Sequence, residues 1–454
     1  MSLNPWASRF ARRWTDDEID AVIYVAACPP DICRLSADAG AEILRDAFQR
    51  IFVSSGQTRK VLRQLIDIAL AHARSHFVSA EVYEHGLYQP KAWGEACAPA
   101  VCFTGLAGDG KSALLVALEK LLGTPTSTNI PGLKGIPLVA GWFLTLRDGA
   151  GLNQLLRPYT MPVDAQNPSE DDLASRSTKD IKIPELFNLA RRRSWRDGVC
   201  LLGIDEFQFV TLGTAANAKA TSLLLQFQGV GPRLIYVANF SLVHRLKRRG
   251  HEDRARLLQC PIILQPEVRS SPDWKRLLEE FKKVAPEVFT FDVDATEELI
   301  HQYTFGIKRS VVALLVAAFR ETHNRGSRHS VGANEISRAY KSAEFTIHRE
   351  EVEILWRQSM SGRVERQDLW CPFSDQENAE NISIAQQAIE DYQRRVDDDY
   401  MRSSLTPAEN AGLQSIEPKR PRGKPSGQLV RMPRQKITKE SLLEGSKRIA
   451  DLDR

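Results

Sequence analysis

The sequence predicts an α/β fold built on a parallel, doubly wound sheet. Short β-rich runs alternate with helical patterns through the middle of the chain, a glycine-rich octapeptide follows the first run, and another run ends in two acids. Strands separated by helical patterns are typical of parallel sheets. The expected strands are Ala100–Thr104, Leu138–Leu146, Val199–Ile204, Arg233–Ala238 and Pro261–Leu264.

The composition is that of a globular protein with room for two or three domains. Of 454 residues, 43% are hydrophobic and 26% are charged. The balance of 61 basic against 57 acidic residues is too even to indicate a polyanionic partner by itself. No apolar run approaches the roughly 18 residues that span a bilayer. The 7 cysteines lack paired spacing, which fits a reducing compartment. We expect a cytoplasmic protein without membrane contact.

The patterns divide the chain into four stretches. Residues 1–95 are expected to be helical and to serve as a partner-binding region, and residues 96–268 contain the α/β core. Residues 269–356 return to helices. Residues 357–454 are expected to hold one amphipathic helix, Ile382–Met401, and a flexible tail with eight Lys or Arg and no acid between Pro418 and Lys439. The polar stretch Pro162–Asp180 is expected to be a surface loop or insertion.

The glycine-rich octapeptide matches the P-loop pattern completely. It follows a β-run and opens the helix expected at Ala113–Leu122, which is the context that separates a P-loop from a chance glycine-rich turn. Glycines let backbone N–H groups converge on phosphates, and the helix N-terminus favours an anion. Lys111 is expected to reach the β- and γ-phosphates of ATP, and the Ser112 hydroxyl to bind Mg²⁺. The predicted nucleotide-binding residues are Gly105, Leu106, Ala107, Gly108, Asp109, Gly110, Lys111, Ser112 and Ala113.

A second signal is the apolar run Leu201–Ile204, which ends in Asp205 and Glu206. Ligands bind at the carboxyl ends of parallel strands, where such acids are tolerated. We expect Asp205 to act on the Mg²⁺ side and Glu206 to activate the attacking water. Without the P-loop upstream, a pair of surface acids would be the better interpretation.

A third run, Leu234–Ala238, ends in Asn239. If its strand neighbours the carboxylate strand, Asn239 would hold the attacking water or contact the γ-phosphate. The alternative is an asparagine that caps a turn.

Together these residues resemble the AAA+ ATPases over about residues 96–345. The resemblance implies a five-stranded sheet in the order 5-1-4-3-2, a helical lid, and a sensor role for Asn239. It also nominates Arg309 in the run Thr304–Arg309 as the lid arginine that meets the γ-phosphate. The usual form has proline where this sequence has Lys308.

A narrower resemblance is to transposition-regulator ATPases of the TnsC, TniB and MuB kind. It is carried by the runs Arg254–Leu264, Ser271–Trp274 and Gly306–Ser310. The resemblance implies an oligomer, a ring or a helical filament with about six or seven subunits per turn, that assembles with ATP on double-stranded DNA without sequence preference. It also implies contacts with a transposase and target-selection proteins. Arg254 and Arg256 would reach a neighbouring subunit's ATP; the alternative for either is a basic surface turn.

DNA contact would require clustered basic residues. Three clusters occur: Arg191–Arg193 with Arg196, Arg245 with Lys247–Arg249, and the tail from Lys419 to Lys439. The resemblance adds Arg147, in the loop after the second strand. Contacts of this kind are made to phosphates and carry little sequence preference. The tail is equally interpretable as a solubilising segment.

Two other functions share the same core. One is a signalling or defence NTPase, STAND-like, that acts through protein partners without DNA. The other is a replication-initiator or helicase-loader ATPase, which would normally bring a winged-helix DNA reader that the sequence after residue 345 does not reveal. All three interpretations predict hydrolysis of ATP to ADP and phosphate.

Overall fold

The computed structural model describes residues 4–32, 35–89, 93, 98–146, 156, 159–160, 183–207, 216–269, 271–324 and 330–373. The predicted loop Pro162–Asp180, the helix Ile382–Met401 and the basic tail lie outside these ranges. The N-terminal helices are α1 (Pro5–Ser8), α2 (Asp16–Ile23), α3 (Ala37–Arg50), α4 (Gly56–His76) and α5 (Ala80–Tyr88). Serine or threonine side chains cap α2, α3, α4 and α5, which explains where these helices begin.

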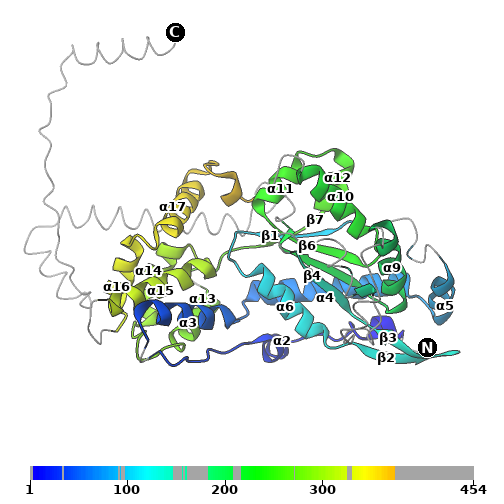
Figure 1. Cartoon of the computed structure of the whole chain (residues 1–454), viewed down its shortest axis with the longest axis horizontal. Coiled ribbons are helices and arrows are strands. Elements are labelled where there is room, and N and C mark those ends of the chain that lie inside the picture. The colour runs from blue at the N-terminus through cyan, green and yellow to red at the C-terminus, as the bar shows by residue number, and fades with distance from the viewer. Residues whose placement is uncertain are drawn as a thin grey trace, which may run out of the picture. The chain divides into compact units, whose positions relative to one another are not determined.

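Five parallel strands form the central sheet, in the order β4-β5-β6-β1-β7 (Figure 1). This is the order 5-1-4-3-2 when the five are numbered along the chain, so the predicted fold class is confirmed. Each strand overlaps an expected run. Their bounds are β1 (Val101–Gly105), β4 (Gly141–Thr145), β5 (Leu201–Asp205), β6 (Arg233–Asn239) and β7 (Cys260–Leu264).

Alternate strand residues face two different helical layers. Cys102, Ile204 and Tyr236 pack into one apolar cluster with the helices that follow the strands. Val101, Phe103 and others enter a second cluster, which contains the N-terminal helices and α6. The sheet is thus covered on both faces (Figure 1), and both sets of strand side chains are buried. The core helices are α6 (Lys111–Leu122), α9 (Ile183–Arg196), α10 (Ala216–Gln228), α11 (Phe240–Lys247) and α12 (His251–Leu258).

A helical lid follows β7 and has a third apolar cluster of its own. It forms where the sequence pattern placed helices. Within the described ranges, the last α-helix is α17, and a short turn of 3-10 helix, η4 (Gln367–Leu369), follows it. The lid helices are α13 (Pro272–Lys282), α14 (Val293–Thr304), α15 (Lys308–His323), α16 (Ala333–Lys341) and α17 (Thr346–Ser361).

The N-terminal helices divide between the sheet and the lid. Helices α1, α2 and α4 contribute to the cluster that covers one face of the sheet. Helix α3 instead packs on α15, and Leu44 and Phe48 belong to the lid cluster. The chain crosses from sheet to lid and back within its first 60 residues, which the apolar periodicity alone did not reveal.

A two-stranded hairpin between α6 and β4 was not predicted. Its strands, β2 (Thr126–Ile130) and β3 (Leu133–Leu138), pair antiparallel around Pro131 and Gly132. Gly132 has φ of 84°, the conformation required at the third position of a type II turn, which proline before it favours. The Pro-Gly pair was the signal available in the sequence. No residue of β2 is buried, so no apolar alternation accompanied that signal.

Within the described ranges, the structure contains no helix of the length and apolarity that a membrane span requires.

Because α3 packs on the lid, truncation of two adjacent residues on this helix is expected to lower the free energy of unfolding by different amounts. Leu44 is fully buried, whereas Ile43 is 39% exposed. Leu44→Ala is expected to lower the free energy of unfolding by about 2–5 kcal/mol, because it leaves a cavity between α3 and the lid. Ile43→Ala is the matched control, with a much smaller effect expected. Denaturant titration measures both, and equal losses would contradict the assignment of α3 to the lid.

Candidate functional site

The P-loop joins the end of β1 to the start of α6. Gly108 and Gly110 have φ of 96° and 94°, values that L-residues with a side chain rarely adopt. A Cβ on Gly105 would lie 2.5 Å from the carbonyl oxygen of Leu264 on the neighbouring β7. Gly110 is also the N-cap of α6 and offers no capping side chain. The first N–H groups of α6 are therefore not capped by a side chain, the arrangement in which a helix N-terminus binds phosphate.

Lys111 is buried and folds back on its own loop. Its Nζ donates hydrogen bonds to the carbonyl oxygens of Gly105, at 3.0 Å, and Leu106, at 2.5 Å. Burial lowers the pKa of Lys111, while Asp109 and Asp205 act in the opposite direction. The ammonium is thus held at the mouth of the loop by backbone carbonyls, next to the uncapped start of α6.

Asp205 and Glu206 lie at the carboxyl end of β5. Glu206 adopts a left-handed conformation with φ of 58°, and its N–H donates to Oδ1 of Asp205 at 2.8 Å. A non-glycine residue at positive φ is uncommon and recurs at functional sites. Burial and then the neighbouring Asp205 raise the pKa of Glu206, whereas Arg309 and Lys111 lower it. The raised pKa makes this carboxylate a better proton acceptor than an exposed glutamate.

Asn239 ends β6, directly beside the P-loop strand. In the parallel register it pairs with Gly105. Although it occupies the N-cap position of α11, its side chain makes no capping hydrogen bond. The turn-capping alternative therefore does not describe its side chain in this structure.

The lid contacts the P-loop directly at the start of α15. The backbone N–H of Arg309 donates to the carbonyl oxygen of Gly108 at 3.2 Å. A Cβ on Gly108 would lie 2.6 Å from the Cβ of Arg309, so the glycine allows this close approach. Lys308, where the AAA+ pattern has proline, extends to within 3.9 Å of Glu267. With Lys308 in place of proline, Arg309 still lies next to the P-loop.

A cavity of about 1010 Å³ brings these residues together. Its walls include the loop and the start of α6, both acids after β5, Asn239 and Arg309. Ser112 and Asp205 face the same space and offer a hydroxyl and a carboxylate, the oxygen donors that Mg²⁺ prefers. The residues present therefore fit a nucleotide with its magnesium ion.

The cavity has a wall that sequence analysis missed. It is formed by the end of α3, by the segment between α3 and α4, and by side chains of the lid helices. Apolar periodicity predicted helices in these stretches, but it did not show that their side chains meet, because the wall forms only when α3 packs on the lid. The residues are Phe48, Ile51, Phe52, Val53, Leu277, Phe281, Val312 and His348.

Arg254 and Arg256 lie away from the cavity of their own chain. Both are exposed on α12, and the carbonyl oxygen of Arg256 accepts from Ala100 N, at the start of β1. The P-loop follows the other end of β1, about 16 Å away at 3.3 Å per strand residue. Neither arginine is placed to act on a nucleotide in its own chain.

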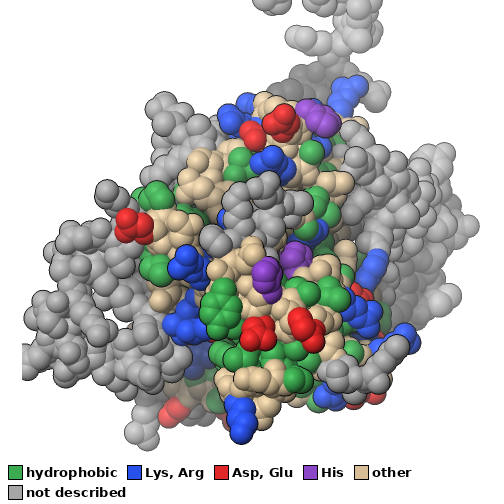
Figure 2. All heavy atoms as spheres, turned by 90° about the vertical axis from the view of Figure 1, so that its right-hand side faces the viewer, with side chains coloured by type: hydrophobic (Ala, Val, Ile, Leu, Met, Phe, Trp, Pro, Cys, Tyr) green, Lys and Arg blue, Asp and Glu red, His purple; other side chains and the backbone are tan. Residues whose placement is uncertain are grey.

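In the first basic cluster, two of the arginines form ion pairs within the chain. Arg193 and Arg196 both pair with the buried Asp197, at 3.2 and 2.8 Å. Figure 2, which faces the side of α5 and α9, shows the described Lys and Arg side chains interspersed with acidic and hydrophobic ones. Arg147 and the tail from Lys419 to Lys439 fall outside the described ranges.

The second cluster, on α11, binds the strap formed by residues 365–373. Lys247 donates to the carbonyl oxygen of Pro372 and lies 4.9 Å from the Phe373 ring. Arg248 donates to Gln367, and Arg249 pairs with Asp253. The strap therefore ties α17 of the lid back to the α/β core.

Comparisons with known proteins add only distant similarity. No protein-family model and no curated protein matches the chain. Among solved structures, the chain is similar to the Orc1 protein of Aeropyrum pernix in complex with DNA, at 17% identity over 62% of this chain and 71% of that chain, with a TM-score of 0.36. Cdc6p of Pyrobaculum aerophilum is 14% identical over 76% of this chain and 84% of that chain, with a TM-score of 0.40. A Walker-type ATPase of Pyrococcus abyssi is 14% identical over 68% and 87%, with a TM-score of 0.37. Similarity at this level assigns no activity.

The buried carboxyl of Asp109, in the P-loop, is expected to make the stability of the folded protein depend on pH. It is 4% exposed, and burial raises its pKa to about 7 against the lowering effect of Lys111 and Lys308. A carboxyl with a raised folded-state pKa binds more protons when folded than when unfolded, so stability falls as pH rises from about 4 to about 7. Asp109→Asn is expected to stabilise the protein more at pH 8 than at pH 5, by on the order of 1–4 kcal/mol at the higher pH.

Thermal unfolding at both pH values measures this difference. The control is Asp46→Asn, which changes an exposed aspartate on α3. If the stabilising effect of Asp109→Asn were the same at pH 5 and pH 8, the ionisation of Asp109 would not be the cause.

Proposed function

We propose that this chain is an ATPase of the AAA+ class that hydrolyses ATP to ADP and phosphate. The observation that carries the proposal is the single cavity lined by the P-loop, Asp205, Glu206, Asn239 and Arg309. These groups come from four separate segments of the chain. A surface cleft of chance origin would not gather an uncapped helix N-terminus, two acids, an amide and a lid arginine.

Each residue has a role that its position supports. Phosphates accept hydrogen bonds from the N–H groups of residues 108–113, and Lys111 exchanges its carbonyl partners for β- and γ-phosphate oxygens. Ser112 and Asp205 hold Mg²⁺, which when bound neutralises phosphate charge. Arg309 adds a positive charge from the lid at the γ-phosphate end.

Hydrolysis then requires one water in line with the γ-phosphorus. Glu206 accepts a proton from this water, and Asn239 orients it by hydrogen bonding. The water oxygen bonds to the γ-phosphorus as the bond to the β–γ bridging oxygen breaks, which releases ADP and phosphate. Burial and the neighbouring Asp205 raise the pKa of Glu206. Proton transfer from the water to Glu206 is therefore more favourable than transfer to a glutamate with an ordinary pKa.

Two substitutions separate binding from chemistry. Lys111→Ala is expected to weaken ATP affinity about 100-fold or more, because it removes the only phosphate-binding ammonium that the P-loop pattern supplies. Glu206→Gln keeps the shape of the site and leaves the P-loop and Lys111 unchanged, so it is expected to retain binding and to slow hydrolysis by roughly 100- to 1000-fold. Equilibrium binding of a fluorescent ATP analogue and phosphate release measure the two effects. Normal hydrolysis by Glu206→Gln would refute its role as the base.

The finer proposal is a transposition regulator that assembles on double-stranded DNA. Its support is the resemblance of the segments around Arg254–Leu264, Ser271–Trp274 and Gly306–Ser310 to such ATPases. The exposed positions of Arg254 and Arg256, far from their own P-loop, suit residues that complete the site of an adjacent subunit. Arg192 is exposed on α9, where a side chain of its charge can contact a DNA phosphate. Recruitment of a transposase and of target-selection proteins follows as part of this proposal.

Assembly on DNA tests the finer proposal directly. Full-length protein with Glu206→Gln, ATP and duplex DNA is expected to form rings or helical filaments visible by negative-stain microscopy, with retention on DNA that falls as salt rises. Lys111→Ala is the matched control and should not assemble. Monomers that do not bind duplex DNA at low salt would contradict this proposal and favour a signalling or defence NTPase. Preference for one duplex sequence would favour a replication initiator instead.

A further inference from the structure

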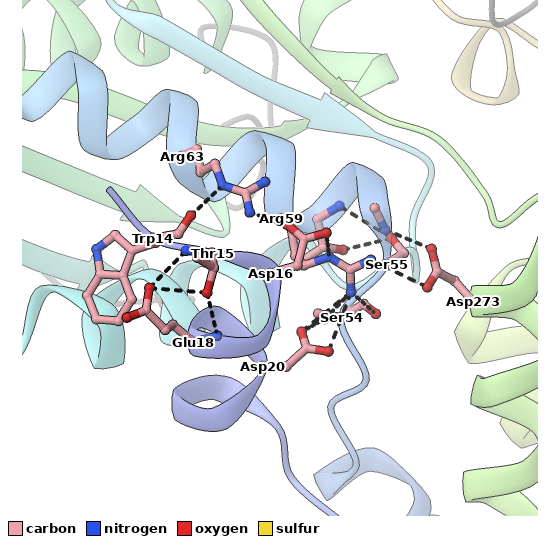
Figure 3. Close-up of polar contacts among 12 residues, drawn as sticks. Trp14, Thr15, Asp16, Glu18, Asp20, Ser54, Ser55, Arg59, Arg63 and Asp273 are labelled. Carbon is pink, nitrogen blue, oxygen red and sulfur yellow. Dashed lines mark hydrogen bonds and ion pairs between the residues drawn. The ribbon is translucent and has the colours of Figure 1, made fainter. Parts of the chain in front are cut away.

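A charged cluster joins the start of α4 to α2 and to the lid helix α13 (Figure 3). Its centre is Arg59, in the first turn of α4, with a side chain only 13% exposed. Arg59 lies close to three carboxylates. Its Nε is 3.2 Å from Asp16, its Nη1 is 3.4 Å from Asp20, and its Nη2 is 3.7 Å from Asp273.

These carboxylates come from two different parts of the fold. Asp16 and Asp20 belong to α2, which packs against the sheet layer, whereas Asp273 begins the lid helix α13. Asp273 also accepts a hydrogen bond from Gly56 N at 2.8 Å, so a lid side chain binds the start of α4. Arg276, one turn further along α13, donates to Asp20 at 2.8 Å.

The cluster also holds the segment that lines the cavity. Arg59 donates to the backbone oxygen of Ser54 at 3.4 Å and to its hydroxyl at 3.0 Å. The Ser54 hydroxyl in turn donates to Asp20. Ser54 immediately follows Ile51, Phe52 and Val53, which face the cavity, and α13 contributes Leu277 and Phe281 to the opposite part of the same wall.

Exposed ion pairs usually contribute little, but this cluster differs from them. A largely buried guanidinium with several acceptors forms a network with restricted geometry. Burial would raise the pKa of Asp20, yet its contacts with Ser54, Arg276 and Arg59 hold that pKa below its usual range. Asp20 is therefore charged at neutral pH, and Arg59 and Arg276 both compensate its charge.

We propose that Arg59 is a positioning residue for the nucleotide cavity. By joining Asp20, Asp273 and Ser54, it fixes residues 51–53 relative to lid helix α13, so that a bound nucleotide and the lid stabilise each other through this contact. The proposal rests on the proposed nucleotide-binding function and adds a residue that touches no nucleotide atom. Arg59 thereby links occupancy of the cavity to the N-terminal helix α2.

Arg63 supplies a matched control on the same helix. It pairs with Asp16 and donates to the carbonyl oxygen of Trp14, and both partners precede or begin α2 (Figure 3). None of its described contacts reaches the lid or residues 51–55. Arg63→Gln therefore removes the same charge from the same helix without breaking the link between cavity wall and lid.

The test compares full-length wild type, Arg59→Gln, Arg59→Lys and Arg63→Gln in binding N-methylanthraniloyl-ATP. We expect Arg59→Gln to weaken affinity about tenfold, with partial rescue in Arg59→Lys, and Arg63→Gln to stay within about twofold of wild type. Hydrogen exchange of residues 51–55 and of α2 is expected to slow on nucleotide binding in wild type and Arg63→Gln, but not in Arg59→Gln. If Arg59 only stabilised the fold, Arg59→Gln would lower the melting temperature, but residues 51–55 and α2 would still exchange more slowly when nucleotide binds.

The outcomes distinguish the two levels of proposal. If wild type fails to bind the analogue, the ATPase proposal is wrong and this inference falls with it. If wild type binds and Arg59→Gln binds with the affinity and protection of Arg63→Gln, the positioning role is refuted while the ATPase proposal stands.

Should Arg59→Gln not fold, Asp273→Asn decides the question: it retains an acceptor for Gly56 but loses the charge that faces Arg59. An affinity equal to wild type would then overturn the proposal, and a several-fold loss would support it.

Discussion

The parallel register of β5, β6 and β1 is the constraint on which the rest of the site depends. Because these strands are adjacent and run in the same direction, their carboxyl ends meet at one edge of the sheet. Gly105 pairs with Asn239, and Asp205 ends the next strand. Three segments that are distant in sequence thereby present a phosphate loop, an amide and two acids to the same cavity. A change in strand order would separate them, whatever their individual conformations.

Much of this edge was predictable from sequence, for physical reasons. The glycines of the P-loop are required by backbone conformation and by close approach to Leu264, so their spacing carries local information. The apolar runs before Asp205 and Asn239 are fully or mostly buried strands, and strands of this kind have a recognisable composition. The strand order itself came from the AAA+ resemblance, since periodicity does not specify which strands are neighbours.

The parts that escaped prediction depend on tertiary contacts. Helices α3 and α4 have similar amphipathic patterns, yet α3 packs on the lid and α4 on the sheet. An apolar stripe indicates that a helix face is buried, but it does not identify the partner. The cavity wall at residues 51–53 arises only from that division. Likewise, the sequence of a basic cluster does not show whether its side chains already have partners within the chain, as Lys247 has in the strap that follows α17.

The route of the chain between sheet and lid has a mechanical consequence. The backbone passes between these two parts after α2, after α3 and after β7, and the strap at residues 365–373 returns to α11. A body attached at one point can swing widely, whereas one attached at several separated points can only tilt or slide by small amounts. The lid is attached in the second manner. Attachment of this kind favours small, shear-like displacements of packed helices over a wide hinge rotation.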